Sequence, residues 1–462
     1  MARDRLLNRQ EELRQLEGAW RAARRAQPQL VVVWGRRRVG KTFLLAHFVR
    51  GKRSVFFGAT QQAEAVELGR LAAAVRRDLG DRTADLLGGG FQNWEAALRF
   101  LAALAATEPL AVVLDEVPYL TRSTPGFPSI VQAVWDYLRR GTKLLLVLTG
   151  SAITTIEAMI GSGGPLRGRP TLSLRLDPLD LWNARAFLPK LDPELLIEAY
   201  AACGGYPLHL AAWDQAESTQ LNLERLAGTS GGLLLEDAVA IMGEELPETG
   251  GYARILAATG RGKTKYAEIT AEAEQRIEHP LEVLTRAGFV SKVLPVGAPR
   301  GARPNYAIAD TYLAFWFRVL YSDIHLIEAG QGAAVLRRAR PRWEDHLGHV
   351  FEDCARAHAG QLVRRGKLPR DLVVGRWWAT SGEPCEIDVL GLQGGRAALV
   401  GEAKWQKNPL GMAEIESLRR KIVRTPRPVE TPIYALWGRA GVAADLRRTG
   451  VKGFDLEDLL SD

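Results

Sequence analysis

The segment Gly35-Arg-Arg-Arg-Val-Gly40-Lys41-Thr42 places two glycines, a lysine and a threonine at the spacing GxxxxGK[ST]. Glycines at these positions let backbone N–H groups turn toward an anion, and the start of a following helix adds partial positive charge. Lys41 would neutralise the charge of the β- and γ-phosphates, and the Thr42 hydroxyl would contact Mg²⁺. The spacing therefore predicts a phosphate-binding loop.

The residues around this motif support the same interpretation. An apolar run, Leu30–Trp34, precedes it and a helical pattern follows, which is the strand–turn–helix context that the motif requires. A glycine-rich turn that arose by chance is the alternative, and it would not need that context. Arg38 within the motif and Phe43 directly after it are assigned to the same site. We expect ATP and Mg²⁺ as the ligands.

Two adjacent carboxylates, Asp115 and Glu116, follow the apolar run Leu110–Leu114. Charged side chains next to a buried strand are costly unless they have a partner or a function. Asp115 is the expected acid of the Mg²⁺ shell, and Glu116 is the expected general base for the attacking water. Glu116 and Lys41 are therefore the predicted catalytic residues of hydrolysis. A solvated strand end is the alternative interpretation.

Two further features bear on the same chemistry. Thr149-Gly150-Ser151 ends another strand, where a hydroxyl would sense the γ-phosphate or cap the following helix. Arg167 and Arg169 lie in a loop rich in glycine and proline. One of them would act as an arginine finger on a neighbouring site, or both belong to a solvated basic loop.

A second group of acidic residues lies near the C-terminus. Glu402 and Lys404 share one face of an apolar strand because strand residues two apart point the same way. Asp388 belongs to an alternating strand that would lie alongside, and Glu352 flanks an upstream helical stripe. Carboxylates and a lysine gathered in this way suit Mg²⁺ or Mn²⁺ and the activation of a water. A salt-bridged surface hairpin is the alternative.

The elements that must position these residues follow from hydrophobic periodicity. Short apolar runs alternate with helical patterns up to about residue 175, which predicts an open parallel sheet covered on both faces. The expected strands are Leu30–Trp34, Ser54–Phe57, Leu110–Leu114, Lys143–Leu148 and Thr171–Leu176. The fold class is thus α/β, with a P-loop ATPase domain (1–178), a helical lid (179–245), a winged helix-turn-helix with a connecting helix (246–335) and a C-terminal α/β domain (336–462).

Composition narrows the class of protein. The chain has 462 residues, 25% of them charged, and a net charge of +8, which is compatible with nucleic acid as a partner. Its three cysteines, Cys203, Cys354 and Cys385, form no CxxC pair, so a disulfide framework and a structural zinc site are not supported. The sequence shows no apolar leader and no run long enough to span a bilayer. We expect a cytoplasmic protein with no membrane partner.

The order of several motifs resembles the archaeal-type ATPases of the AAA+/STAND group. These motifs are Arg9–Leu13, the Walker A and Walker B segments, the Thr-Gly-Ser strand end and Cys203-Gly-Gly-Tyr206-Pro207. The resemblance covers about residues 5 to 245. In that group the Gly-Gly-x-Pro turn lies in the lid near the nucleotide. The resemblance implies that Tyr206 and Pro207 close over the base.

The C-terminal pattern, Asp-x13-Glu-x-Lys after a helical glutamate, resembles the PD-(D/E)XK nuclease superfamily and implies a restriction-endonuclease-like fold. Here Glu386-Ile387-Asp388 replaces the first Pro-Asp. The resemblance implies a metal site made by Glu352, Asp388 and Glu402, with Lys404 orienting the water. The whole chain resembles archaeal and bacterial ATPases that carry a nuclease-like C-terminal domain of unknown function.

These observations lead to one main hypothesis and one alternative. The main hypothesis is an ATP-hydrolysing protein that couples its nucleotide state to a winged helix and a metal-dependent nuclease-like domain, acting on DNA. The alternative is a nucleotide-dependent signalling switch that is not an enzyme and binds a partner protein. A homo-oligomer is a further candidate assembly.

Overall fold

The computed structural model describes residues 6–80, 88–138, 141–246, 250–380, 382–425 and 427–461. The chain divides into two compact units. The N-terminal unit runs to Leu179 and includes two later segments, Tyr206–Leu208 and Ile241–Glu245, and the C-terminal unit contains the rest. Within the described ranges, no helix has the length and apolar character needed to cross a bilayer.

A parallel sheet of five strands forms the centre of the N-terminal unit, which confirms the predicted fold class. Its strands are β1 (Gln29–Trp34), β2 (Ser54–Gly58), β3 (Leu110–Asp115), β4 (Leu144–Gly150) and β5 (Leu172–Arg175). They are ordered β2-β3-β4-β1-β5, and all neighbours pair in parallel. Because parallel strands end at the same edge, the loops after β1, β3 and β4 lie along one side of the sheet.

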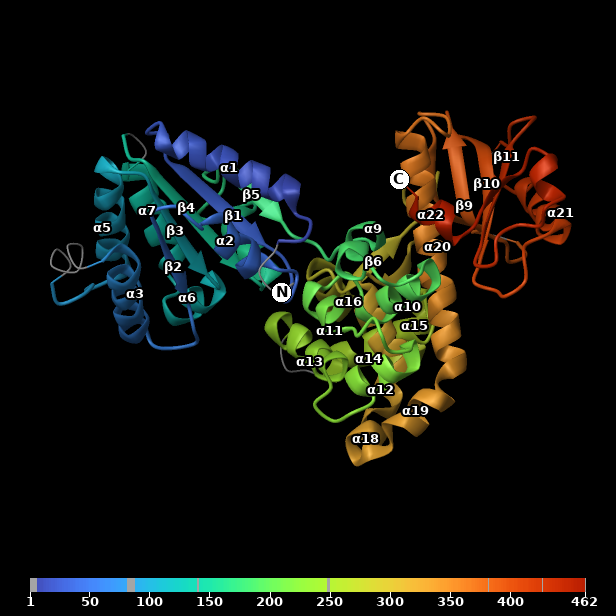
Figure 1. Ribbon diagram of the computed structural model, residues 1–462, viewed down its shortest axis with the longest axis horizontal. Coiled ribbons are helices and arrows are strands. Elements are labelled where there is room, and N and C mark those ends of the chain that lie inside the picture. Colours follow the sequence, from blue (N-terminus) through green and yellow to red (C-terminus); the bar gives the residue numbers. More distant parts are fainter. Residues whose placement is uncertain are drawn as a thin grey trace. The chain divides into compact units, whose positions relative to one another are not determined.

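Helices cover both faces of this sheet (Figure 1). They are α1 (Gln10–Arg24), α2 (Lys41–Phe48), α3 (Glu64–Leu79), α5 (Trp94–Thr107), α6 (Val117–Ser123), α7 (Phe127–Leu138) and α8 (Ile153–Ile160). Leu30 and Val32 of β1 belong to the core that α3, α5 and α7 complete. The alternate residues Val31 and Val33 are also fully buried, and α1 lies on the opposite face from α5. Burial on both faces explains why the strands read as continuous apolar runs.

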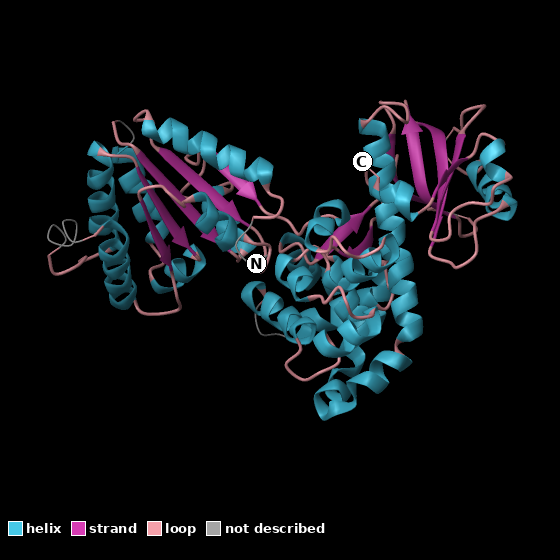
Figure 2. Ribbon diagram, in the orientation of Figure 1, coloured by secondary structure: helices cyan, strands magenta, loops and turns pink. Residues whose placement is uncertain are grey.

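The first half of the C-terminal unit is mainly helical, as Figure 2 shows. Its elements are α9 (Leu181–Ala184), α10 (Pro193–Cys203), α11 (Pro207–Ala212), α12 (Thr219–Leu226), α13 (Leu233–Glu245), α14 (Gly250–Gly260), α15 (Tyr266–Ala273), α16 (Glu278–Arg286), the antiparallel strands β6 (Val290–Val293) and β7 (Asn305–Ile308), α17 (Thr311–Phe315), α18 (Ile324–Leu326) and α19 (Gly332–Arg338). Two buried aromatic residues fix the start of α13. Tyr312 Oη donates to the Leu234 carbonyl, and Trp316 Nε1 donates to the Leu235 carbonyl, each at 2.9 Å.

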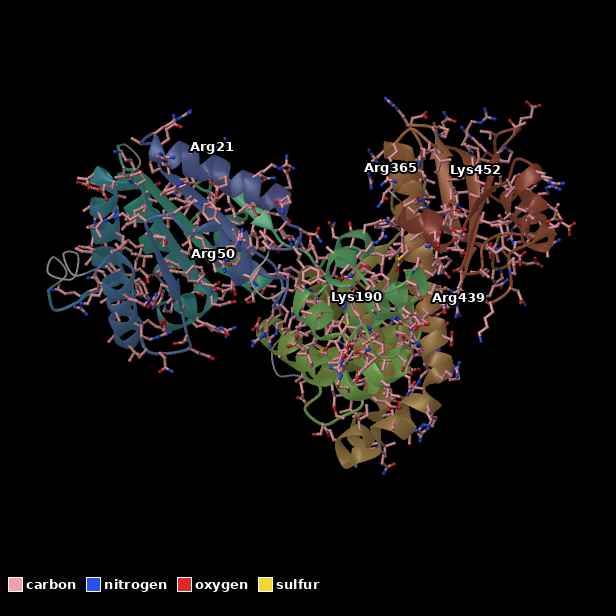
Figure 3. All side chains as sticks on the ribbon, in the orientation of Figure 1. Arg21, Arg50, Lys190, Arg365, Arg439 and Lys452 are labelled. Atoms are coloured by element: carbon pink, nitrogen blue, oxygen red, sulfur yellow. The ribbon has the colours of Figure 1, made fainter. Side chains whose placement is uncertain are left out.

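A mixed sheet of five strands forms the rest of this unit. The order is β12 (Lys452–Phe454), β11 (Ile433–Gly438), β10 (Arg396–Lys404), β9 (Glu386–Gln393) and β8 (Val373–Trp378). The long helix α20 (Arg340–Arg364) and α21 (Met412–Ile422) lie on opposite sides of it, and α22 (Leu456–Leu460) ends the described chain (Figure 1). Arg439, labelled in Figure 3, follows β11 and forms an ion pair with Glu194 of α10.

Candidate active site

The loop between β1 and α2 has the backbone shape that its glycines make possible. Gly35 has φ 150° and Gly40 has φ 95°, and both angles are unfavourable for residues with a Cβ atom. A Cβ on Gly35 would lie 2.0 Å from the Leu176 carbonyl oxygen. Arg38 also adopts a left-handed conformation, with φ 71°. The chain therefore turns sharply and begins α2 at Lys41.

The Lys41 ammonium lies within this turn. Its Nζ donates to the carbonyl oxygens of Gly35 at 2.8 Å and Arg36 at 3.0 Å, and the residue is buried. Burial lowers the pKa of Lys41, although the nearby carboxylates Glu116 and Asp115 oppose that change. The Lys41 ammonium is thus held by carbonyl groups of the same loop.

The two predicted motifs meet directly. Thr42 Oγ1 donates to Asp115 Oδ2 at 2.7 Å, joining the start of α2 to the end of β3. Burial raises the pKa of Asp115, and the hydrogen bond from Thr42 acts in the opposite direction. A hydroxyl and a carboxylate that converge on one point are the hard oxygen donors that Mg²⁺ prefers. These two residues fit a Mg²⁺ ion bound with phosphate.

Ser151, the residue that follows β4, holds the Glu116 carboxylate in place. Its Oε2 accepts from the Ser151 backbone N–H at 3.0 Å, and its Oε1 accepts from the Ser151 hydroxyl. Glu116 has φ 57°, a left-handed conformation that costs energy outside glycine and that often occurs at functional sites. The sequence predicted that the Thr-Gly-Ser segment would sense phosphate or cap a helix. Ser151 binds the carboxylate of the predicted base, and the sensing of phosphate by this segment stays a prediction.

The other predicted residues of this site differ in their exposure to solvent. Tyr206 is fully buried, whereas the Phe43 side chain is 40% exposed. Pro207 is close to the loop, since its Cγ lies 3.7 Å from the point where a Cβ on Gly40 would be. Thr149 Oγ1 is buried and makes no hydrogen bond within the described part of the chain. Its hydroxyl points to no protein partner there.

The candidate arginine fingers differ in their contacts. Arg169 Nε and Nη2 bind the two oxygens of Asp136 at 2.9 and 2.7 Å. This two-point ion pair fixes Arg169 within its own chain. Arg167 is exposed. Whether either arginine acts as a finger stays a prediction.

The C-terminal sheet brings Asp388, Glu402 and Lys404 together. Lys404 Nζ lies 2.7 Å from Glu402 Oε1 and 3.7 Å from Asp388 Oδ2. The antiparallel register pairs Val389 with Gly401, which places these side chains on neighbouring strands as the sequence predicted. Lys421 of α21 adds an ion pair of 2.8 Å to Glu402 Oε2. Lys421 could not be predicted from the sequence because no local motif connects α21 to β10.

The charges in this cluster are strongly perturbed. Burial, followed by the charge of Asp388, raises the pKa of Glu352 to about 7. Burial and the charge of Glu402 raise the pKa of Asp388. Burial alone would raise the pKa of Glu402 as well, but hydrogen bonds from Lys404 and Lys421 lower it. Glu352 is thus the carboxyl of this cluster that takes up a proton most readily.

The predicted three-carboxylate metal site stays a prediction. Across the described ranges, no group of three or more His, Cys, Asp or Glu side chains is arranged to hold a metal ion. Each oxygen of Glu402 already has a lysine partner, and Asp388 Oδ2 accepts from the Ala403 N–H at 3.0 Å. As arranged here, these residues do not fit an ion that all three carboxylates would bind.

Two family models match parts of the chain. Residues 6–212 match the model described as an ATPase domain predominantly from Archaea. Residues 316–419 match the model described as archaeal and bacterial proteins of unknown function. The first match, the parallel sheet and its glycine-rich loop all indicate a P-loop ATPase domain in this part of the chain.

Individual proteins are similar over most of the chain. An uncharacterized protein of Methanocaldococcus jannaschii is 27% identical over 444 residues, covering 93% of this chain and 95% of that protein. The solved Walker-type ATPase PABY2304 of Pyrococcus abyssi has a TM-score of 0.50 and 19% identity, covering 69% of this chain and 97% of that one. Cdc6p from Pyrobaculum aerophilum has a TM-score of 0.37 and 14% identity, covering 73% and 96%. The P. abyssi structure supports the fold.

Proposed function

We propose that this protein binds ATP with Mg²⁺ and hydrolyses it at the carboxyl edge of the parallel sheet. The hydrogen bond of 2.7 Å between Thr42 and Asp115 carries the proposal. It joins two motifs that lie far apart in the sequence at the place where nucleotides bind in open α/β sheets. Lys41 and Glu116 contribute charge to the same small region, since both appear in the electrostatic environment of Asp115.

Each residue then has a role in phosphoryl transfer. The backbone of Gly35–Gly40 surrounds the phosphates, and the Lys41 ammonium moves from the loop carbonyls to phosphate oxygens. Thr42 and Asp115 would hold Mg²⁺, which neutralises developing negative charge when it is bound. Glu116, oriented by Ser151, accepts a proton from the attacking water.

The remaining predicted residues would complete the nucleotide pocket. Pro207 lies next to Gly40, which supports a place for the Tyr206-Pro207 turn over the bound nucleotide. Arg38 belongs to the loop itself, and Phe43 exposes its ring one residue after Thr42. We assign Arg38, Phe43 and Pro207 to contacts with the nucleotide, and the fully buried Tyr206 to the support of the turn that carries Pro207.

ATP affinity measured by isothermal titration calorimetry tests the proposal. Lys41→Ala removes the cation and should lower ATP affinity by at least about a hundredfold, because a charge-assisted contact to phosphate is lost. The matched control is Lys143→Ala. Lys143 donates to the Thr107 carbonyl just before β4 begins, at the opposite edge of the sheet from the site. Equal ATP affinity in the two variants would reject the assignment of the site.

A second candidate function belongs to the C-terminal domain. We propose a nuclease-like domain that acts on DNA, supported by the convergence of Asp388, Glu402 and Lys404 on adjacent strands. The three helices α14, α15 and α16 followed by the hairpin β6–β7 have the order of a winged helix, which supports the same assignment. Because the described carboxylates do not fit a shared metal ion as arranged, cutting that depends on such an ion would require them to rearrange.

Incubation with plasmid DNA and either Mg²⁺ or Mn²⁺ tests this second function. Cutting by the wild-type protein that is lost in Asp388→Ala and retained in Asp371→Ala would support it. Asp371 is an exposed carboxylate that accepts a hydrogen bond from Gln393 at 3.0 Å. ATP binding without any cutting would favour the alternative of a nucleotide-dependent switch that binds a partner protein.

A further inference from the structure

The last turn of α13 reaches the proposed nucleotide site, and no sequence motif predicted it. Ile241–Glu245 belongs to the N-terminal unit, although the preceding residues of the same helix belong to the C-terminal unit. Two adjacent acids in this turn, Glu244 and Glu245, contact different parts of the site. The turn therefore brings two acidic side chains of α13 to the proposed nucleotide site.

Glu244 contacts the phosphate-binding loop. Arg37, which lies between Gly35 and Gly40, donates from Nη1 to Glu244 Oε1. The Glu244 carbonyl accepts from Arg122 Nη2 of α6 at 3.4 Å. The second carboxylate oxygen, Oε2, is buried and has no hydrogen-bond partner in the described part of the chain. A buried oxygen without a partner is held at a cost, which an arrangement that satisfies it would remove.

Glu245 contacts the other side of the site. Its carboxylate accepts from the Ile153 N–H, from the Thr154 N–H at 3.3 Å and from the Thr154 hydroxyl at 2.9 Å. These groups begin α8, shortly after Ser151, which orients Glu116. Displacing the end of α13 would therefore also alter the segment that positions the predicted base.

The negative charge of bound ATP would favour displacement of Glu244 at the end of α13. The negative charge of Glu244 acts on the Lys41 ammonium, whose pKa it helps to raise against the effect of burial. Phosphates bound by the loop would introduce further negative charge at short range. Two anions at short range repel, and both would seek the guanidinium of Arg37, which forms strong paired contacts with phosphate.

We propose that Glu244 is a positioning residue that competes with the γ-phosphate of ATP for Arg37, so that the end of α13 distinguishes ATP from ADP. This inference rests on the proposed nucleotide site and adds a regulatory element to it. Without nucleotide, Glu244 holds Arg37 and the helix end stays docked. With ATP, Arg37 turns to the phosphate and the helix end is released.

A buried hydrogen bond connects α13 to α11. His209 Nε2 lies 2.8 Å from Asp237 Oδ2, and both residues are buried in the C-terminal unit. His209 directly follows Tyr206–Leu208, the other late segment that clusters with the N-terminal unit. Asp237 lies on α13, one turn before Ile241. The hydrogen bond links α11, which begins at Pro207, to α13.

Glu244→Gln tests the competition without removing the hydrogen-bond acceptor. Since the neutral amide competes less well for Arg37, ATP affinity should rise by about fivefold or more, with a smaller rise for ADP. Glu236→Gln is the matched control, because Glu236 is an exposed acid on the same helix. Equal ATP and ADP affinities in the two variants would overturn the inference.

A fluorescent label on Gly243→Cys reports the movement itself. Gly243 is exposed, and a Cβ there would meet no atom within 4 Å. Cys203, Cys354 and Cys385 are buried, so the new thiol should react selectively. ATP should change the fluorescence more than ADP, and Glu244→Gln should reduce that difference.

An outcome that contradicts the inference can be told apart from a failure of the nucleotide site. If the labelled protein binds ATP and the signal is the same for ATP and ADP, Glu244 does not act as proposed. If calorimetry shows that the wild-type protein binds neither nucleotide, the proposed nucleotide site is wrong and the inference falls with it.

Discussion

Replacing Gly35 with alanine tests why the nucleotide loop begins with glycine. The usual explanation is freedom of the backbone, but the structure adds a steric one. A Cβ on Gly35 would lie 2.0 Å from the Leu176 carbonyl oxygen, whereas carbon–oxygen contacts are normally at least about 3.3 Å. Either the loop or the chain after β5 must therefore move by roughly 1.3 Å.

The cost of Gly35→Ala has two parts. Moving Leu176 endangers the hydrogen bond of 2.7 Å from its N–H to the Trp34 carbonyl, worth about 1 kcal/mol. Holding an alanine at φ 150° adds about 1–3 kcal/mol of backbone strain. The sum, about 2–4 kcal/mol, corresponds to a fall in Tm of roughly 4–16 °C for a domain of this size.

Thermal unfolding followed by circular dichroism, together with calorimetric ATP titration, measures both consequences. Gly58→Ala is the matched control, because Gly58 ends β2 at the same edge of the sheet and a Cβ there meets nothing within 4 Å. The control should change stability by no more than about 0.5 kcal/mol. If Gly35→Ala matches the control in Tm and in ATP affinity, the steric reasoning is wrong.

Two further predictions concern groups whose partners are known. Ser151→Ala removes the hydroxyl bonded to Glu116 and should lower kcat for ATP about tenfold while leaving ATP affinity unchanged, because one hydrogen bond to a charged group is lost. Steady-state kinetics would refute this if affinity fell and kcat did not. The pKa of Glu352 is about 7 in the folded protein, against an ordinary value of 4.5. Between pH 4.5 and 7 the folded protein therefore keeps a proton on Glu352 that the unfolded chain has released. Stability should therefore fall by ~1–3 kcal/mol between pH 4.5 and 7, and Glu352→Gln should remove this contribution from the urea-unfolding free energy. An unchanged pH dependence in the variant would show that Glu352 is not the responsible group.

Local patterns in the sequence were sufficient to predict much of the N-terminal fold. Each predicted strand exists within a residue or two of its expected ends, because a strand buried on both faces must be apolar throughout. Parallel pairing then brings the strand ends together, which explains why Asp115 was predicted to lie near the loop of Lys41. In the same way, the alternation of strand residues predicted that Glu402 and Lys404 face Asp388.

The features that were missed depend on packing between distant elements. Lys421 reaches Glu402 because α21 packs across the C-terminal sheet, and no spacing in the sequence expresses that contact. The contacts of Glu244 and Glu245 depend on where the end of α13 docks, which helical periodicity does not specify. Periodicity predicts the buried face of a helix but does not identify what covers that face.

Hydrolysis of ATP by Glu116→Gln is the most direct test of the central claim, that the loop of Lys41 and the acids after β3 form one catalytic site. The amide preserves the shape of the side chain and can still contact Ser151, but it cannot accept a proton from water. The account predicts that Glu116→Gln binds ATP with Mg²⁺ about as tightly as the wild-type protein and hydrolyses it at least about a hundredfold more slowly. Wild-type turnover in this variant would contradict the account.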